Sequence, residues 1–155
     1  MIESLNWVKQ RFYCSIGDVF EQLRTQVRSD VEERERLRPK QDDHYAFKFS
    51  ATDRSFTAML DGHKIHKTVE FPLEQRAISV SSDGNLILSA KTTLSNDGRC
   101  VLLIKNVEYE NWQVRKMALD DLFFSEMAPP DLLERLGARP ALKSLLPCHG
   151  LPKLA

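Results

Sequence analysis

The chain has 155 residues, enough for one domain that buries its own core. Its 22 basic and 22 acidic residues cancel, so bulk charge gives no reason to expect binding to duplex DNA or to an anionic membrane. No apolar run approaches the roughly 20 residues that a membrane-spanning helix needs.

Residues 1–38 are predicted to be helical, with a break near 14–17. Ser15 can cap a new helix there, because Asp18 follows in a pattern that resembles a capping box. Gly17 weakens the helix at the same point. The apolar residues that keep helical spacing before the break are Leu5, Val8 and Phe12.

After the break, apolar residues recur at steps of three and four and predict one helical face that lies on a sheet. Charged residues crowd the end of this helix, and we expect Glu32 to pair with Arg36 and Glu35 with Arg38. This end is interpreted as solvated, and an arginine face that binds a phosphate or carboxylate is the alternative. The apolar face consists of Ile16, Val19, Phe20, Leu23, Val27 and Val31.

Residues 44–115 are predicted to form an antiparallel meander of about six strands. Asp-Gly pairs punctuate this stretch. They suit tight hairpin turns because glycine accepts a positive φ without a Cβ clash. The three pairs lie at residues 61–62, 83–84 and 97–98.

The strands differ in how many of their faces are apolar. Tyr45, Phe47 and Phe49 alternate with small or polar residues, which predicts one buried aromatic face. The strand at 100–104 is apolar on both sides and needs cover on both. A last strand is predicted over 107–114.

Residues 116–147 are predicted to be helical, and 148–155 form a tail. The predicted fold is therefore α+β: one domain in which a long N-terminal helix packs on a curved antiparallel sheet, followed by short C-terminal helices. The C-terminal region is apolar enough that it must either dock on the body of the protein or bind a partner. Its leucines are Leu142, Leu145, Leu146, Leu151 and Leu154.

Three cysteines, Cys14, Cys100 and Cys148, are an odd number without paired spacing. This pattern favours free thiols in a reducing compartment over a disulfide framework. The N-terminus shows no basic stretch followed by an apolar run, so we expect no secretory signal and a cytoplasmic protein.

His63, Lys64, His66 and Lys67 form the most unusual short run in the sequence. Its two lysines could contact an acidic partner, and an ordinary exposed hairpin is the alternative. A zinc site needs four ligands at recognisable spacing, which the sequence does not offer, so we predict no metal. The only other soft ligands considered are His44, Cys148 and His149.

No catalytic or cofactor signature emerges from the sequence. Cys100 lies in an apolar strand, which is typical of a core residue, and adjacent residues such as Cys148 and His149 rarely hold catalytic geometry on a tail. No glycine-rich phosphate loop or dinucleotide fingerprint is present. We therefore predict no catalytic residue and no cofactor, and an enzyme is the less favoured class.

The sequence favours a small protein-binding module, such as a chaperone, adaptor, inhibitor or immunity-type protein, with a homodimer left open and no nucleic-acid partner expected. The predicted contact residues are the basic run and the C-terminal leucines named above. The alternative is a ligand-binding cup or minor enzyme with an aromatic pocket between sheet and helix. That pocket would be lined by Phe47, Phe49, Phe56, Tyr109 and Trp112.

Overall fold

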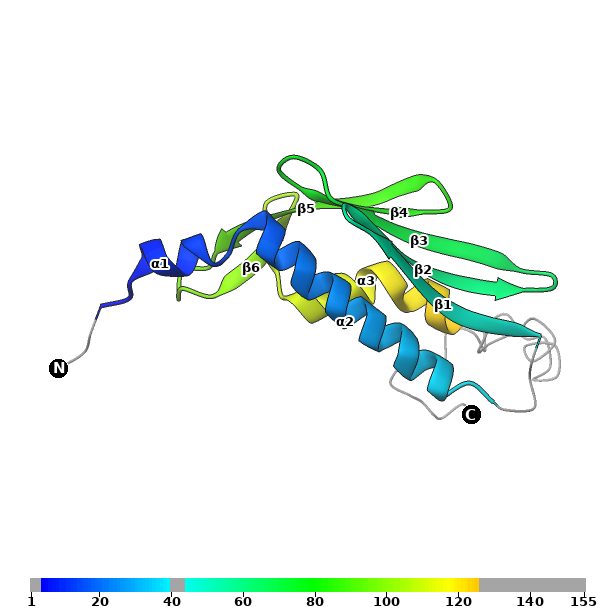
Figure 1. Cartoon of the computed structure of the whole chain (residues 1–155). Helices are drawn as coiled ribbons and strands as arrows, with labels where there is room; N and C mark the ends of the chain where they lie inside the picture. The colour runs from blue at the N-terminus through cyan, green and yellow to red at the C-terminus, as the bar shows by residue number, and fades with distance from the viewer. Residues whose placement is uncertain (1–3, 40–43, 126–155) are drawn as a thin grey trace, which may run out of the picture. The chain divides into compact units, whose positions relative to one another are not determined.

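The computed structural model describes residues 4–39 and 44–125. The chain divides into two compact units, Met1–Phe123 and Phe124–Ala155, and only Phe124 and Ser125 of the second unit are described. The first unit is α+β, as predicted, with helices packed on an open antiparallel sheet (Figure 1). The predicted short C-terminal helices and the tail lie outside the described residues, and a single domain over the whole chain stays a prediction.

The N-terminal helical region breaks where the sequence predicted. Helix α1 (Trp7–Phe12) ends before Cys14, and helix α2 (Ile16–Arg36) starts directly after Ser15. The Ser15 side chain accepts a hydrogen bond from the Asp18 N–H at 3.1 Å and so caps α2. The predicted apolar face of α2 is confirmed: Val19, Phe20, Leu23, Val27 and Val31 are buried, and Ile16 packs against the core.

Seven strands pair antiparallel in chain order, one more than the predicted six or so. This meander joins each strand to the next by a local turn, so neighbours in the sequence are neighbours in the sheet (Figure 1). The strands are β1 (Tyr45–Thr52), β2 (Ser55–Gly62), β3 (His66–Pro72), β4 (Ile78–Ser82), β5 (Asn85–Leu94), β6 (Cys100–Ile104) and β7 (Val107–Tyr109).

Two of the three predicted Asp-Gly turns are confirmed, with φ of +87° at Gly84 and +84° at Gly98. The Asp61-Gly62 prediction is wrong, because both residues belong to β2. Glycine is needed at position 62 for another reason: a Cβ there would lie 2.7 Å from the His44 carbonyl oxygen. The strands therefore approach too closely at this point for any side chain.

The predicted last strand is too long. Strand β7 ends at Tyr109, and helix α3 (Asn111–Phe124) begins two residues later, so Trp112 and Val114 are helical. The Glu110 N–H donates to the Gln113 Oε1 at 2.8 Å, the reach-back half of a capping box, and this contact starts the helix.

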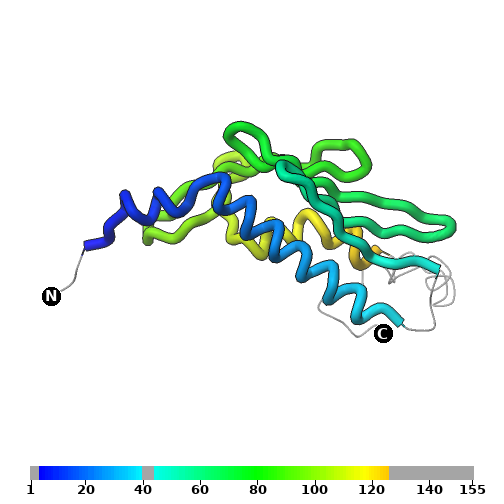
Figure 2. The backbone as a smooth tube through the Cα atoms, in the orientation of Figure 1, coloured from blue at the N-terminus to red at the C-terminus, as the bar shows by residue number. Residues whose placement is uncertain are grey.

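Helices α2 and α3 both lie on the same face of the sheet (Figure 2). Phe20 of α2 contacts Phe56 of β2, with ring centres 5.2 Å apart, and Phe123 of α3 contacts Phe47 of β1 at 5.5 Å. Arg34, buried between these elements, donates from Nε to the Phe123 carbonyl oxygen at 2.8 Å. The core thus lies between one sheet face and two helices.

Ion pairing at the end of α2 matches the prediction in part. Glu35 pairs with Arg38 at 2.6 Å, as expected. Arg36 pairs with Glu33 instead of the predicted Glu32; spacings of three and four both bring side chains together on a helix.

Candidate interaction surface

Helix α1 buries none of its residues in the described part of the chain. Three large side chains of this region are exposed to solvent: Trp7 (63%) and Phe12 (71%) on the six-residue helix, and Tyr13 (61%) at its C-cap. We call the apolar residues of this region the α1 surface. It comprises Leu5, Trp7, Val8, Phe12 and Tyr13.

Two cations lie among these apolar side chains. Lys9 and Arg11 are both exposed on α1, and the first turn of the helix has no acidic residue. Arg11 also donates from a terminal guanidinium nitrogen to the Cys14 carbonyl oxygen at 2.9 Å, which satisfies a group at the helix end. The α1 surface is therefore aromatic and positively charged, and its Trp, Tyr and Arg residues are the types enriched at the centres of protein interfaces.

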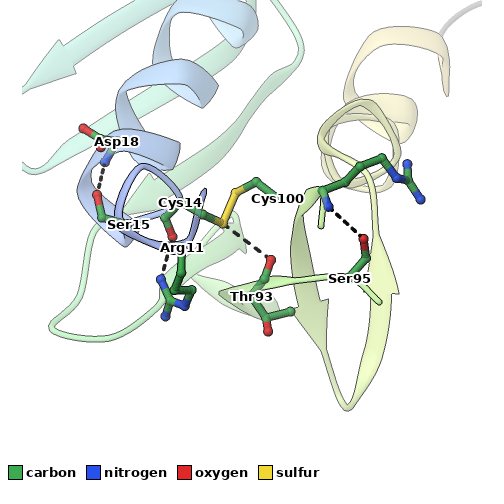
Figure 3. The surroundings of a disulfide bond; sticks show 8 residues. Arg11, Cys14, Ser15, Asp18, Thr93, Ser95 and Cys100 are labelled. Carbon is green, nitrogen blue, oxygen red and sulfur yellow. Dashed lines mark hydrogen bonds between the residues drawn. A yellow bond between two sulfur atoms is a disulfide. The ribbon is translucent and has the colours of Figure 1, made fainter. Parts of the chain in front are cut away.

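A disulfide bond anchors the base of α1 (Figure 3). Cys14, 1% exposed, is bonded to Cys100 at the start of β6, with the two Cα atoms 5.5 Å apart. The Cys14 Sγ also contacts the Thr93 carbonyl oxygen at 3.4 Å. The prediction of free thiols is wrong for these two cysteines, because the fold brings together residues that are 86 positions apart in the sequence.

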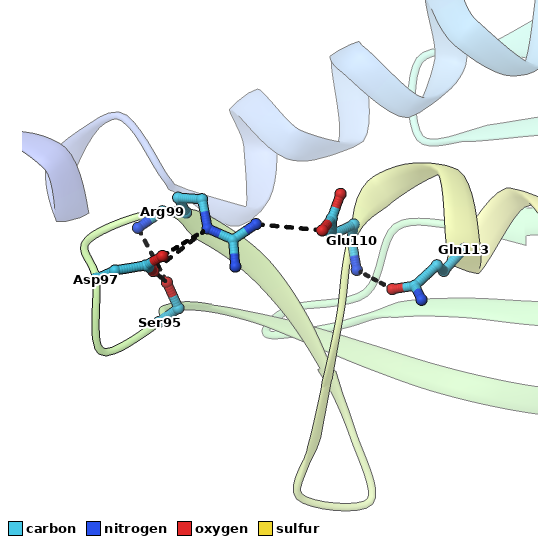
Figure 4. A network of polar contacts seen from close by, with 5 residues as sticks. All are labelled: Ser95, Asp97, Arg99, Glu110 and Gln113. Atoms are coloured by element: carbon cyan, nitrogen blue, oxygen red, sulfur yellow. Dashed lines mark hydrogen bonds and ion pairs between the residues drawn. The ribbon is translucent and has the colours of Figure 1, made fainter.

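The turn between β5 and β6, which supports this anchor, is held by polar contacts (Figure 4). The Ser95 hydroxyl bonds the Asp97 carboxylate and holds the pKa of that group below its usual range, helped by the Arg99 guanidinium. Arg99 also reaches Glu110 at 3.2 Å, and this pairing raises the pKa of Arg99. The turn is thereby linked to the start of α3.

Leu5 rests directly on this turn. A Cβ placed on Gly98 would overlap the Leu5 Cδ2, so the glycine leaves room for the leucine side chain. Together with the disulfide bond, this contact fixes α1 at both its ends while its aromatic side chains stay exposed.

A second candidate site is a groove of about 520 Å³ between α2 and β1, which we call the α2–β1 groove. It contains only two of the five aromatic residues predicted to line a pocket, Phe47 and Phe49. The structure does not bring the other three to it: Phe56 is buried against Phe71, Tyr109 packs against the core, and Trp112 is 53% exposed. The groove is lined by Arg28, Val31, Glu32, Glu35, Arg36, Phe47 and Phe49.

The four residues of the basic run do not share one face. His66 lies on the solvent side of β3, 3.4 Å from Asp61, whereas Lys67 points to the helix side and approaches Asp121 of α3 at 3.8 Å. His63 and Lys64 are exposed in the turn before β3. The pKa of Asp61 is lowered, chiefly by its hydrogen bond from Lys48 and then by His66.

The predicted leucines of the C-terminal region lie outside the described residues. Within residues 4–39 and 44–125, no three His, Cys, Asp or Glu side chains are placed to hold a metal ion. Among those same residues, no helix is long and apolar enough to cross a membrane. No family model, no curated protein and no solved structure matches this chain.

Sequence reasoning missed the α1 surface because it placed Leu5, Val8 and Phe12 on one helical face and left Trp7 and Tyr13 out. Only Trp7, Val8 and Phe12 belong to the helix, while Leu5 and Tyr13 flank it, and all five are exposed. Five large apolar residues in and beside a helix of only six residues are the signal that would have pointed to this surface.

Proposed function

We propose that the protein is a binding module that holds a partner protein through the α1 surface. The observation that supports this most is a helix whose apolar side chains are all exposed although its base is fixed by a disulfide bond. A helix of six residues is too short to be stable by itself in water. Contact with a partner would bury the aromatic side chains and supply the missing packing energy.

The charge of α1 defines the chemistry of the partner. Lys9 and Arg11 stand beside the aromatic side chains, so the complementary surface has an apolar pocket and an acidic rim. A two-fold pairing of α1 with a second copy would place these cations against each other, which costs energy. The module is therefore proposed to bind a different protein, and a homodimer is an outcome that the experiment tests.

The disulfide bond also bears on where the module acts. Disulfides persist in oxidising compartments and are rare in the cytosol. The cytoplasmic location expected from the sequence rested in part on free thiols, and the bond between Cys14 and Cys100 counts against that part. An oxidising compartment is the proposed location.

The ligand-cup alternative has less support than the binding module. Its aromatic residues are divided between a groove, the core and the surface, so they do not enclose one ligand.

The test compares two double variants with the wild-type protein. Trp7→Glu with Phe12→Glu places two charges in the α1 surface, and Leu86→Glu with Ile87→Glu makes the same change at an exposed apolar site on β5. Each immobilised protein is exposed to an extract of its native source, and the retained proteins are quantified by mass spectrometry. We expect one protein that the wild type and the β5 variant both retain to be at least about tenfold less abundant on the α1 variant. A tenfold loss corresponds to roughly 1.4 kcal/mol of binding free energy.

Circular dichroism and thermal unfolding establish that both variants fold. Light scattering during gel filtration of the wild type, over a hundredfold dilution series, tests self-association. Equal retention by all three proteins would overturn the proposal, and so would a wild-type dimer that the α1 substitutions dissociate.

A further inference from the structure

Strand β1 lies at one edge of the seven-stranded sheet, and among the described strands it pairs with β2 alone. The Phe47 N–H points away from β2 and donates to the Glu35 Oε1 of α2 at 2.9 Å. Backbone groups of alternate residues in an antiparallel strand point the same way, so the Phe49 N–H and C=O also face away from β2. Neither Phe49 group has a hydrogen-bond partner within residues 4–39 and 44–125.

Side chains of α2 bond the backbone near both ends of β1, and Phe49 in its middle has no such contact. At one end Glu35 accepts from Phe47, as a neighbouring strand's carbonyl would. At the other end Arg24 donates to the carbonyl oxygens of Thr52 at 2.6 Å and Asp53 at 3.2 Å, where β1 turns into β2. Phe49 lies between these contacts, in the α2–β1 groove.

The groove also presents two charges of opposite sign that have no ion pair among the described residues. Glu35 is paired with Arg38, and Arg36 with Glu33, which leaves Arg28 and Glu32. The Arg28 guanidinium lies over the Phe49 ring, 5.6 Å from its centre. Four residues along a helix span about 6 Å.

Alternate side chains on an extended strand stand about 6.6–6.8 Å apart, close to the separation of Arg28 and Glu32 along α2. A strand laid in the groove can thus place an acidic side chain near Arg28 and a basic one near Glu32. The groove volume of about 520 Å³ accommodates a segment of a few residues.

We propose that the α2–β1 groove binds a short extended segment of another protein by adding it to the edge of β1 at Phe49. The segment runs antiparallel to β1 and carries an acidic residue, any residue and then a basic residue. Its backbone bonds the Phe49 N–H and C=O, its acid pairs with Arg28, and its base pairs with Glu32. This site lies apart from the α1 surface and does not depend on the function proposed for it.

Three blocked hexapeptides provide the test: acetyl-Thr-Val-Asp-Val-Lys-Val-amide, the same peptide with Asp and Lys exchanged, and a neutral version with Ser at both positions. Binding is measured by titration calorimetry and by the hydrogen-exchange rate of the Phe49 amide. The wild-type protein is expected to bind the first peptide at least about fivefold more tightly than either other peptide, and the Phe49 amide is expected to exchange more slowly in the complex.

A charge-swapped protein, Arg28→Glu with Glu32→Arg, sharpens the test because it should prefer the exchanged peptide instead. Equal binding of the three peptides by the wild type would overturn the proposal, as would a preference that does not reverse in the swapped protein. Protection of the Phe49 amide without any peptide at high protein concentration would identify a second copy as the occupant and would also overturn it. The proposal would also be overturned if phosphate or acetate slowed exchange of the Phe49 amide as much as the peptide does.

The Trp7→Glu, Phe12→Glu protein separates the two proposals. It should bind the first hexapeptide as the wild type does, because α1 contributes no residue to the groove. Thermal unfolding of the charge-swapped protein confirms that it folds.

Discussion

Helices α1 and α2 lie on either side of the same disulfide-bonded cysteine, yet they differ completely in burial. A side chain caps the start of each helix. The Lys9 N–H donates to Asn6 Oδ1 and the Asp18 N–H donates to Ser15 Oγ, both at 3.1 Å. Helix α2 buries six residues against the sheet, and α1 buries none. Local capping therefore starts both helices, but within the described residues only α2 buries side chains of its own.

The two helices are therefore held in place for different reasons. Packing of an apolar face holds α2, as is usual in globular proteins. Tethering holds α1, through the Cys14–Cys100 bond and the contact of Leu5 with the turn at Gly98. Substitutions in the two helices should therefore change different quantities: stability in α2, and association in α1.

The largest expected difference is between two substitutions that each remove one phenylalanine, Phe20 from α2 and Phe12 from α1. Phe20→Ala should lower the free energy of unfolding by about 3–5 kcal/mol, because the side chain is 1% exposed and contacts Phe56. Phe12→Ala should change it by less than about 0.5 kcal/mol, because that side chain is 71% exposed. Urea unfolding followed by circular dichroism measures both, and equal losses would show that α1 packs as α2 does.

The next effect concerns the tether. Replacing both cysteines, Cys14→Ser with Cys100→Ser, should lower the free energy of unfolding by about 2–5 kcal/mol, because the bond closes a loop with a sequence separation of 86 residues. Amide exchange in α1 should become as fast as in an unfolded peptide, while the amides of α2 stay protected. If α1 keeps its protection without the bond, tethering is not what holds it.

Two glycines with nearly the same φ test the second anchor of α1. Gly84→Ala and Gly98→Ala should each cost about 1–2 kcal/mol, because both positions have φ near +85°. Gly98→Ala should also displace Leu5, whereas a Cβ at Gly84 meets nothing within 4 Å. We expect faster amide exchange in α1 for the Gly98 variant alone, and an equal response of α1 in both variants would remove Leu5 from the anchor.

The smallest effect is a pH dependence at the end of α2. The hydrogen bond from Arg38, and then the Phe47 N–H, hold the pKa of Glu35 below its ordinary value of 4.5. Glu35 therefore stabilises the fold fully above pH 4.5, and this contribution is lost as the pH falls through the lower pKa of the folded state. Glu35→Gln should therefore flatten the loss of stability as the pH falls below 4.5.

Glu33 is the matched control for this titration. Its pKa is also lowered, by Arg36, but the pair is exposed and belongs to α2 alone. Salt should therefore abolish the contribution of Glu33 and leave most of that of Glu35. Acid unfolding of Glu33→Gln and Glu35→Gln at low and high salt distinguishes the two, and identical curves would show that the contact with Phe47 adds nothing.

Much of the fold could be predicted from local patterns. The spacing of apolar residues identified the buried face of α2, and Ser15 with Asp18 marked its start. The alternation from Tyr45 onward identified β1, and the turns at Gly84 and Gly98 were visible as Asp-Gly pairs. These features depend on residues a few positions apart, which a sequence displays directly.

The failures depend mainly on contacts between residues that are distant in the sequence. Nothing near Cys14 indicates Cys100, and only the folded sheet brings them together. The start of β7 at Val107 matches the prediction, and the error concerns its end, because the strand stops at Tyr109 and α3 begins at Asn111. The exposure of Trp7 was not predicted for a related reason. Helical spacing does not show whether the folded chain offers a surface that covers this side chain.

The Cys14–Cys100 bond makes a closed ring of everything between those residues, including most of the sheet. A protease that cuts once inside this ring, for example after Lys64 in the exposed turn before β3, leaves two pieces joined through sulfur. The nicked molecule would migrate as one band on a gel without reductant and as two bands with it. Damage at such a turn would thus release no fragment, and α1 would stay attached to both halves of the severed backbone.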